Sequence, residues 1–188
     1  NGSFASATST TNGSGIATVV FTSHTVAGTA TTVTATTSAI SGTSSTITTV
    51  AGAASKYLVT SSSSSPVAGA TVTISAQLAD ANDNPVATSG QTVTWTKSNA
   101  NGSFASATST TNGSGVATVV FTSHTVAGTA TTVTATTSAI SGTSSTITTV
   151  AGAASKYLVT SSSSSPVAGA TVTISAQLAD ANDNPVAT

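Results

Sequence analysis

The chain repeats itself with a period of 100 residues. Residues 1–88 and 101–188 align without a gap, and Ile16 against Val116 is the only difference between them. A unit of this length is too long for a solenoid turn, which buries its apolar face only against its neighbours, and it suits a domain with its own core. Nearly identical units also perform the same task, which favours a part used for length or multivalency over an enzyme with one site. We therefore expect a string of similar domains.

The composition predicts β structure. Ser and Thr make up 77 of the 188 residues and only seven residues are charged, so hydroxyl groups have to provide much of the hydration. Thr and Val are β-branched and favour strands, whereas strong helix formers such as Leu and Lys are rare and Glu and Arg are absent. The lack of Cys excludes disulfides, thiolate metal sites and cysteine nucleophiles. Three Lys residues form no basic patch, which argues against nucleic acid as a partner.

Alternating apolar residues predict several short strands within one repeat. In the clearest strand, residues 71–78, the side chains of Val72, Ile74, Ala76 and Leu78 fall on one face. Further strands are expected at 57–60, 91–97, near Phe104, and at 116–123, 129–137 and 146–150. Trp95, the only Trp, is expected at the centre of the core. About seven short strands with regular turns predict a β-sandwich.

The repeat also has a phase, because the chain contains one whole unit and two partial ones. Residues 54–150 are expected to form a complete module after a small-residue linker at 51–54. Residues 1–50 carry only the later strands of a module, and residues 154–188 only the first strands of the next. Each part would leave an apolar sheet face in water without a neighbour. Either the chain is a window of a longer array, or separate chains complete one another by strand donation, and we favour the window because the composite would lack the Trp strand.

Three motifs of the repeat, in this order, resemble one known family. They are the turn at residues 80–86 followed by the Trp95 strand, the segment 111–117, and the segment 128–135. This set is similar to the bacterial Ig-like group 1 repeats of invasin and intimin-type adhesins. The resemblance implies tandem immunoglobulin-like sandwiches that hold a binding tip away from a bacterial surface. The present repeat carries less charge than is usual in that family.

The Asx-rich turn after residue 79 contains the only candidates for a metal site. Asp80, Asn82, Asp83 and Asn84 offer hard oxygen ligands at near-alternate spacing, and Asp180 and Asp183 do so in the second copy. The twelve-residue calcium loop, however, requires a glycine at its sixth position and a final Glu, and the chain has no Glu. We expect a plain polar turn with no cofactor, and calcium shared with a neighbouring module as the weaker alternative.

Other reactive-looking residues are expected to be structural. His24 and His124 lie among many Ser residues, but no Gly-x-Ser-x-Gly elbow accompanies them, so we expect no hydrolase and no enzyme. A Lys–Asn isopeptide bond from Lys56, Lys97 or Lys156 would require a buried acid, and both acids of the repeat fall in what reads as a surface turn. The glycosylation-like triplets at 101–103 and 112–114 are read as Asn-Gly turns.

These observations predict a structural tandem repeat of a long bacterial cell-surface or secreted fibrous protein, used as an adhesin stalk or spacer. One alternative is a subunit of a self-assembling extracellular filament or sheath, whose Thr-rich faces pack with little electrostatic repulsion. Another is a glycan- or ice-binding module. The expected partners are neighbouring repeats or other copies of the chain, and no run of about 20 apolar residues predicts a membrane span.

Overall fold

A computed structural model describes residues 2–187, and over these residues it consists of β-strands joined by turns and loops, without any helix. The chain divides into two compact units. The first comprises the residues up to Ser55 together with Ala79–Val86, and the second comprises Lys56–Leu78 together with the residues from Ala87 onward. The predicted all-β fold is confirmed.

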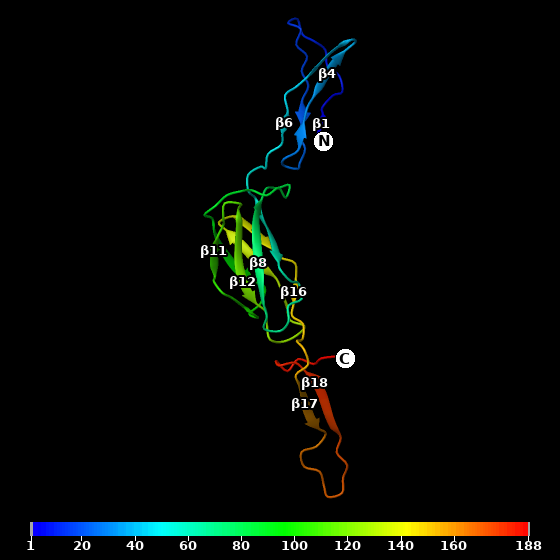
Figure 1. The fold of residues 1–188 in the computed structure, drawn as a ribbon, viewed down its shortest axis with the longest axis vertical. Coiled ribbons are helices and arrows are strands. Elements are labelled where there is room, and N and C mark those ends of the chain that lie inside the picture. Colours follow the sequence, from blue (N-terminus) through cyan, green and yellow to red (C-terminus); the bar gives the residue numbers. More distant parts are fainter. Residues whose placement is uncertain (1, 188) are drawn as a thin grey trace. The chain divides into compact units, whose positions relative to one another are not determined.

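The central part of the second unit contains ten strands. They are β7 (Lys56–Ser61), β8 (Thr71–Ala79), β9 (Thr92–Lys97), β10 (Ser103–Phe104), β11 (Thr108–Thr110), β12 (Val116–Thr122), β13 (Ala130–Thr131), β14 (Val133–Thr137), β15 (Ile140–Thr143) and β16 (Ile147–Thr148). One sheet has the order β10-β12-β8-β7, and the facing sheet has the order β11-β9-β14-β15 (Figure 1). Strands β9, β10, β11 and β12 alternate between the two sheets, so the chain crosses repeatedly from one to the other, and the predicted β-sandwich is confirmed.

The core of this sandwich consists of the inward-facing residues of both sheets. Val72, Ile74, Ala76 and Leu78 of β8 are all buried, as their spacing predicts. Trp95 is buried as well, and its indole Nε1 donates a hydrogen bond of 2.9 Å to Ser109 Oγ. Val119 and Phe121 of β12 lie in the same sheet as β8, and Val93 and Val133 come from β9 and β14 of the facing sheet. Every buried side-chain nitrogen and oxygen in the part of the chain described has a hydrogen-bond partner.

Two strands of the sandwich were not expected from the sequence. Strand β11 contains only Ser and Thr, and it lies at an edge, where no apolar alternation is required. Strand β15 follows β14 through a two-residue hairpin loop that begins at Ser138, whose φ is +45°. Hairpin loops with a positive φ usually carry Gly, Asn or Asp at that position, so the Ser gave no turn signal. The segment expected as one strand at 129–137 is divided between β13 and β14.

The first unit repeats the later half of the sandwich in the same register. Its strands are β1 (Ser3–Phe4), β2 (Phe21–Thr22), β3 (Ala30–Thr31), β4 (Thr34–Thr37), β5 (Ile40–Thr43) and β6 (Ile47–Thr48). The pairings β1–β2, β3–β6 and β4–β5 match β10–β12, β13–β16 and β14–β15 residue for residue. The burial of the side chains differs between the two copies. Val19 is 43% exposed, whereas Val119 is 6% exposed.

The last part of the second unit is a single antiparallel hairpin of β17 (Lys156–Ser161) and β18 (Ile174–Ala179). Tyr157 on β17 is 63% exposed, whereas its equivalent Tyr57 is 3% exposed. The same sequence is therefore covered in one copy and uncovered in the other. The module limits at 54–150, with partial modules at 1–50 and 154–188, remain a prediction.

Candidate functional site

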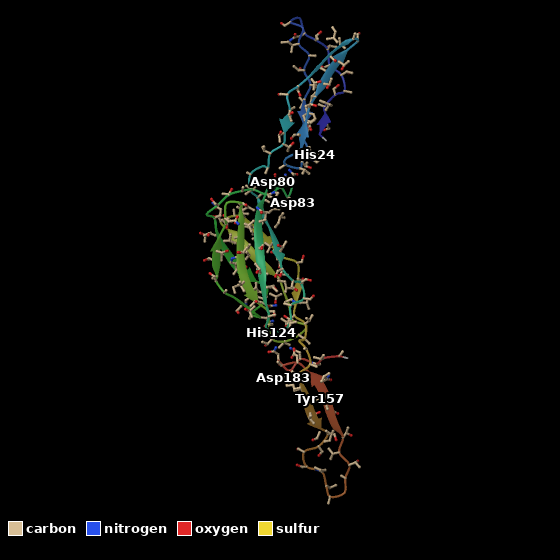
Figure 2. All side chains as sticks on the ribbon, in the orientation of Figure 1. His24, Asp80, Asp83, His124, Tyr157 and Asp183 are labelled. Carbon is tan, nitrogen blue, oxygen red and sulfur yellow. The ribbon has the colours of Figure 1, made fainter. Side chains whose placement is uncertain are left out.

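The loop at residues 80–84, here called the aspartate loop, is built around the carboxylate of Asp80. It follows directly after β8, and it is closed by backbone hydrogen bonds of 3.0 Å from Asp80 N to Asn84 O and 3.2 Å from Asp83 N to Asp80 O. Asp83 has a φ of +67°, a left-handed conformation that Asp tolerates better than most residues. Figure 2 shows Asp80 and Asp83 in this loop, in the same part of the first unit as His24.

Four N–H groups donate hydrogen bonds to the Asp80 carboxylate. Oδ1 accepts from the backbone nitrogens of Asn82 and Asn84, at 2.8 and 2.9 Å. Oδ2 accepts from the backbone nitrogen of Gly52 at 2.8 Å and from the side-chain nitrogen of Asn84 at 2.9 Å. A carboxylate has about four lone-pair positions, so this set occupies all of them. Because Gly52 belongs to the small-residue linker, Asp80 also holds the linker against the loop.

These four hydrogen bonds explain why the pKa of Asp80 is lowered. The pKa of Asp80 is lowered to about 2, first by the side-chain hydrogen bond from Asn84 and then by the backbone hydrogen bond from Gly52. Hydrogen bonds to the charged form favour that form, and they outweigh the opposing effect of desolvation. Asp80 is only 3% exposed, so the expectation that both acids of the repeat lie at the surface is wrong for this residue. Its burial is compensated by the four donors.

The second copy of the aspartate loop, residues 180–184, has the same bonds within the second unit. Asp180 Oδ1 accepts from Asn182 N and Asn184 N, and Oδ2 accepts from Gly152 N at 2.7 Å and from Asn184 Nδ2 at 2.9 Å. The pKa of Asp180 is lowered to about 2, chiefly by the hydrogen bond from Asn184. Asp183 differs from Asp180 in being exposed, and its Oδ1 lies 2.7 Å from Lys156 Nζ. This ion pair is solvent-accessible and contributes little to stability.

The structure brings the weak calcium candidates Asp80, Asn82 and Asp83 into one loop, but it uses them for the turn. The carboxylate oxygens of Asp80 are filled by N–H donors, and a calcium ion would have to displace them. Within residues 2–187 no group of three or more His, Cys, Asp or Glu side chains is placed to hold a metal ion. Asn84, the fourth residue with side-chain oxygen in this turn, completes the donor set with its backbone and side-chain nitrogens.

The two histidines are part of their own turns. His24 Nδ1 accepts a hydrogen bond of 2.9 Å from Val26 N, and His124 Nδ1 accepts one of 3.0 Å from Val126 N. This is a local side-chain-to-backbone bond of the kind that shapes loops. The ring nitrogen that would be bonded to the Asp of a Ser-His-Asp triad, Nδ1, is therefore engaged with the backbone in both copies.

The remaining residues singled out by sequence have local partners too. Lys97 Nζ donates to Asn99 O at 3.2 Å, and Lys156 Nζ donates to Ala181 O at 3.2 Å. In the triplet at 112–114, Asn112 Oδ1 accepts hydrogen bonds from Ser114 N and Val116 N. The predicted turn at Asn112 is confirmed by these bonds.

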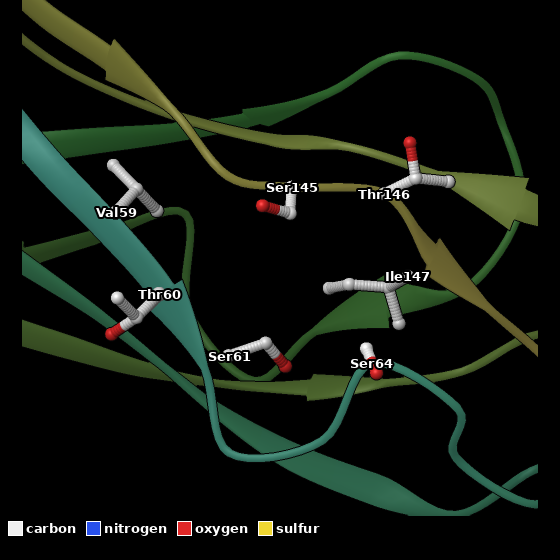
Figure 3. A pocket seen from close by; sticks show the side chains of 7 residues that line it. All are labelled: Val59, Thr60, Ser61, Ser64, Ser145, Thr146 and Ile147. Carbon is white, nitrogen blue, oxygen red and sulfur yellow. The ribbon is translucent and has the colours of Figure 1, made fainter.

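One pocket of the sandwich has a volume of about 250 Å³ (Figure 3). It lies between β7 and the segment that leads into β16, and its lining residues are Val59, Thr60, Ser61, Ser64, Ser145, Thr146 and Ile147. None of these seven side chains titrates near neutral pH, so this pocket supplies hydroxyl groups and aliphatic surface but no general acid or base.

Several solved structures of bacterial proteins are similar to this chain. The Escherichia coli adhesin FdeC matches with a TM-score of 0.49 and 21% identity, over 75% of this chain and 46% of that chain. The D00-D0 domain of intimin matches with a TM-score of 0.46 and 20% identity, over 59% of this chain and 56% of that chain. A glycosyl hydrolase family 2 member from Bacteroides cellulosilyticus gives 0.49 and 17%, over 71% of this chain and 18% of that one.

The chain spans about half the length of the two adhesin chains. No family model matches it, and no curated protein matches it. In the part of the chain that the structure describes, no helix is long and apolar enough to cross a membrane.

Proposed function

We propose that this chain is a segment of a tandem array that works as a structural spacer or stalk in a bacterial cell-surface or secreted fibrous protein. The observation that carries the proposal is the repeat itself, in which two nearly identical copies carry the same aspartate loop with the same hydrogen bonds. A repeated part of this kind supplies length and needs no reactive group, which agrees with the local roles of its His and Lys residues.

The geometry of the sandwich suits a spacer. Strand β8 has nine residues, so at about 3.3 Å per residue it extends roughly 30 Å, and with its loops a module would add about 35–45 Å to an array. Few charges and many hydroxyl groups leave a surface with little long-range attraction or repulsion. The array thereby gains reach from each added repeat without acquiring a new binding site. We propose an extracellular location and no catalytic activity for this segment.

The length of the array is the quantity to test. We would compare the 188-residue chain with chains lengthened by one and by two further copies of residues 89–188, appended after Thr188 so that the phase is kept. Small-angle X-ray scattering should give a maximum dimension that increases by a constant step of about 35–45 Å per copy. Sedimentation should show monomers at every concentration.

The main rival is the self-assembling filament, and the same samples separate it from the spacer. A filament subunit would sediment as growing assemblies when the concentration is raised, even in the shortest chain. A spacer would also be contradicted if the maximum dimension stopped increasing with added copies, because the modules would then fold back on one another.

A further inference from the structure

Asn84 contacts a turn that belongs to the preceding repeat. Its side-chain nitrogen donates to Thr25 O at 2.8 Å, and its side-chain oxygen accepts from Ala27 N at 2.8 Å. Asn84 is separated from these residues by almost 60 positions and is buried, although it lies in a loop. All of these residues belong to the first compact unit. The two bonds therefore join the aspartate loop, which follows β8, to a turn in the repeat before it.

The turn that Asn84 contacts, residues 25–29, is held in shape by its own hydrogen bonds. Thr29 N donates to Val26 O at 3.4 Å, and Gly28, at the third position of this turn, has a φ of +84°. This combination is typical of a type II turn. Gly28 N also donates to Thr49 O at 2.8 Å, and His24 Nδ1 accepts from Val26 N. The turn thus holds Thr25 O as a hydrogen-bond acceptor and Ala27 N–H as a hydrogen-bond donor in fixed positions.

The chemistry of this contact selects Asn at position 84. A primary amide offers a donor and an acceptor in one plane, which matches a backbone carbonyl and a backbone N–H two residues apart. Asp would keep the acceptor but lose the donor, and it would place a second negative charge beside Asp80. The second hydrogen on the Asn84 nitrogen is already directed to Asp80 Oδ2, so the carboxylate orients the amide. Asn84 is the binding residue and Asp80 is a positioning residue.

The same contact occurs in the second unit. Asn184 Nδ2 donates to Thr125 O at 2.8 Å, and Asn184 Oδ1 accepts from Ala127 N at 2.7 Å. Asn184 is buried as Asn84 is. From these contacts we propose that the aspartate loop is a docking site for the type II turn of the preceding repeat, and that this docking restrains the orientation of consecutive repeats. The proposal goes beyond a spacer role, because a filament built from the same repeats would contain the same contact.

The absence of Cys allows a direct measurement of this restraint in the full chain. Ser14→Cys and Ser89→Cys introduce two thiols at exposed positions, one on each side of the first docking site. Spin labels on these thiols report the distribution of distances between the two repeats by double electron–electron resonance. The proposal predicts a narrow distribution for the labelled chain. It predicts a clearly broader distribution for Asn84→Ala, because that side chain makes both bonds.

A second variant removes the contact from the other side. Ala27→Pro removes the backbone N–H that donates a hydrogen bond to Asn84 Oδ1. It also places Pro at the second position of the turn, where type II turns favour it. The turn should therefore persist while the docking is lost, and the distance distribution should broaden as it does in Asn84→Ala. The matched controls are Asn184→Ala and Ala127→Pro, which change the second docking site, and Asn82→Ala, which removes an exposed amide from the same aspartate loop. All three should leave the distribution narrow.

The outcomes separate docking from local loop stability. Broadening in both Asn84→Ala and Ala27→Pro, with narrow distributions in the controls, is the expected result. Broadening in Asn84→Ala alone would overturn the proposal, because Asn84 would then only support its own loop. A distribution that is already broad in the labelled parent, or that broadens only when calcium is chelated, would overturn it as well. None of these results depends on the sedimentation test of the spacer.

Discussion

At the scale of single residues, Gly142 is the glycine of the sandwich whose Cβ position lies nearest to other atoms. It lies in β15, and a Cβ atom built on it would collide with the backbone carbonyl of Tyr57 in β7. Gly142→Ala should therefore lower the free energy of unfolding by about 3 kcal/mol, because the obstacle is backbone that cannot rotate away. Urea unfolding followed by Trp95 fluorescence measures this, since the only Trp of the chain lies in the core of that sandwich.

The repeat supplies the matched control for this substitution. Gly42 occupies the equivalent position in the first unit, and no atom beyond its two chain neighbours lies within 4 Å of its Cβ position. Gly42→Ala should change stability by less than about 0.5 kcal/mol. Equal effects of the two substitutions would contradict the steric explanation and would point to the conformational freedom of glycine instead. Sequence reasoning anticipated the burial of Trp95 from its size, but it could not single out Gly142, because a close approach of two backbones leaves no trace in apolar spacing.

At the scale of elements, protonation of Asp80 should weaken the hydrogen bonds of the aspartate loop at low pH. The pKa of Asp80 is about 2 in the folded chain and has its ordinary value of 3.8 when the chain is unfolded. A lowered folded pKa stabilises the fold at pH values above about 4, and this contribution is lost as the pH falls towards about 2. The Gly52 amide resonance, followed by NMR during acid titration, should move with a midpoint near 2 instead of near 3.8.

The duplicated loop gives this titration an internal reference. In Asp80→Asn the Gly52 resonance should lose its acid transition, whereas Gly152, which donates to Asp180, should keep it. The comparison also identifies which of the two similar resonances belongs to which copy. A Gly52 midpoint near the ordinary value would show that the four N–H donors do not hold the carboxylate in solution.

The sequence predicts elements of this fold where burial imposes a period. Strands β8 and β12 alternate between core and solvent, so their faces could be assigned before the structure was known. Strands β11 and β15 lie at sheet edges and consist largely of Ser, Thr and Gly, so no alternation marks them. The aspartate loop was recognised as an Asx-rich turn. Its docking partner was not, because it is a backbone turn almost 60 residues away that carries no side-chain signal.

At the scale of the whole molecule, identical sequences differ in burial according to what covers them. Ile47 is 40% exposed and Ile147 is 2% exposed, although both lie in the same local strand pairing. Local sequence therefore sets the pairing of these strands, while the core depends on the first strands of the same module. The predicted module, residues 54–150, contains both the first and the later strands of a sandwich. Its limits can be tested by supplying the first strands that residues 1–50 lack.

A copy of residues 54–100 joined in front of Asn1 keeps the phase of the repeat and provides those strands, including the Trp strand. We expect residues 1–50 to complete a second sandwich, and calorimetry should show an unfolding enthalpy larger by about 60–80 kcal/mol, the value for a domain of about 100 residues. A shorter extension with residues 54–88 omits the Trp strand and imitates completion by the end of another chain. It should give a much smaller increase, because a central strand and its aromatic anchor are missing. Equal enthalpies for the two extensions would support end-to-end strand donation over the window of a longer array.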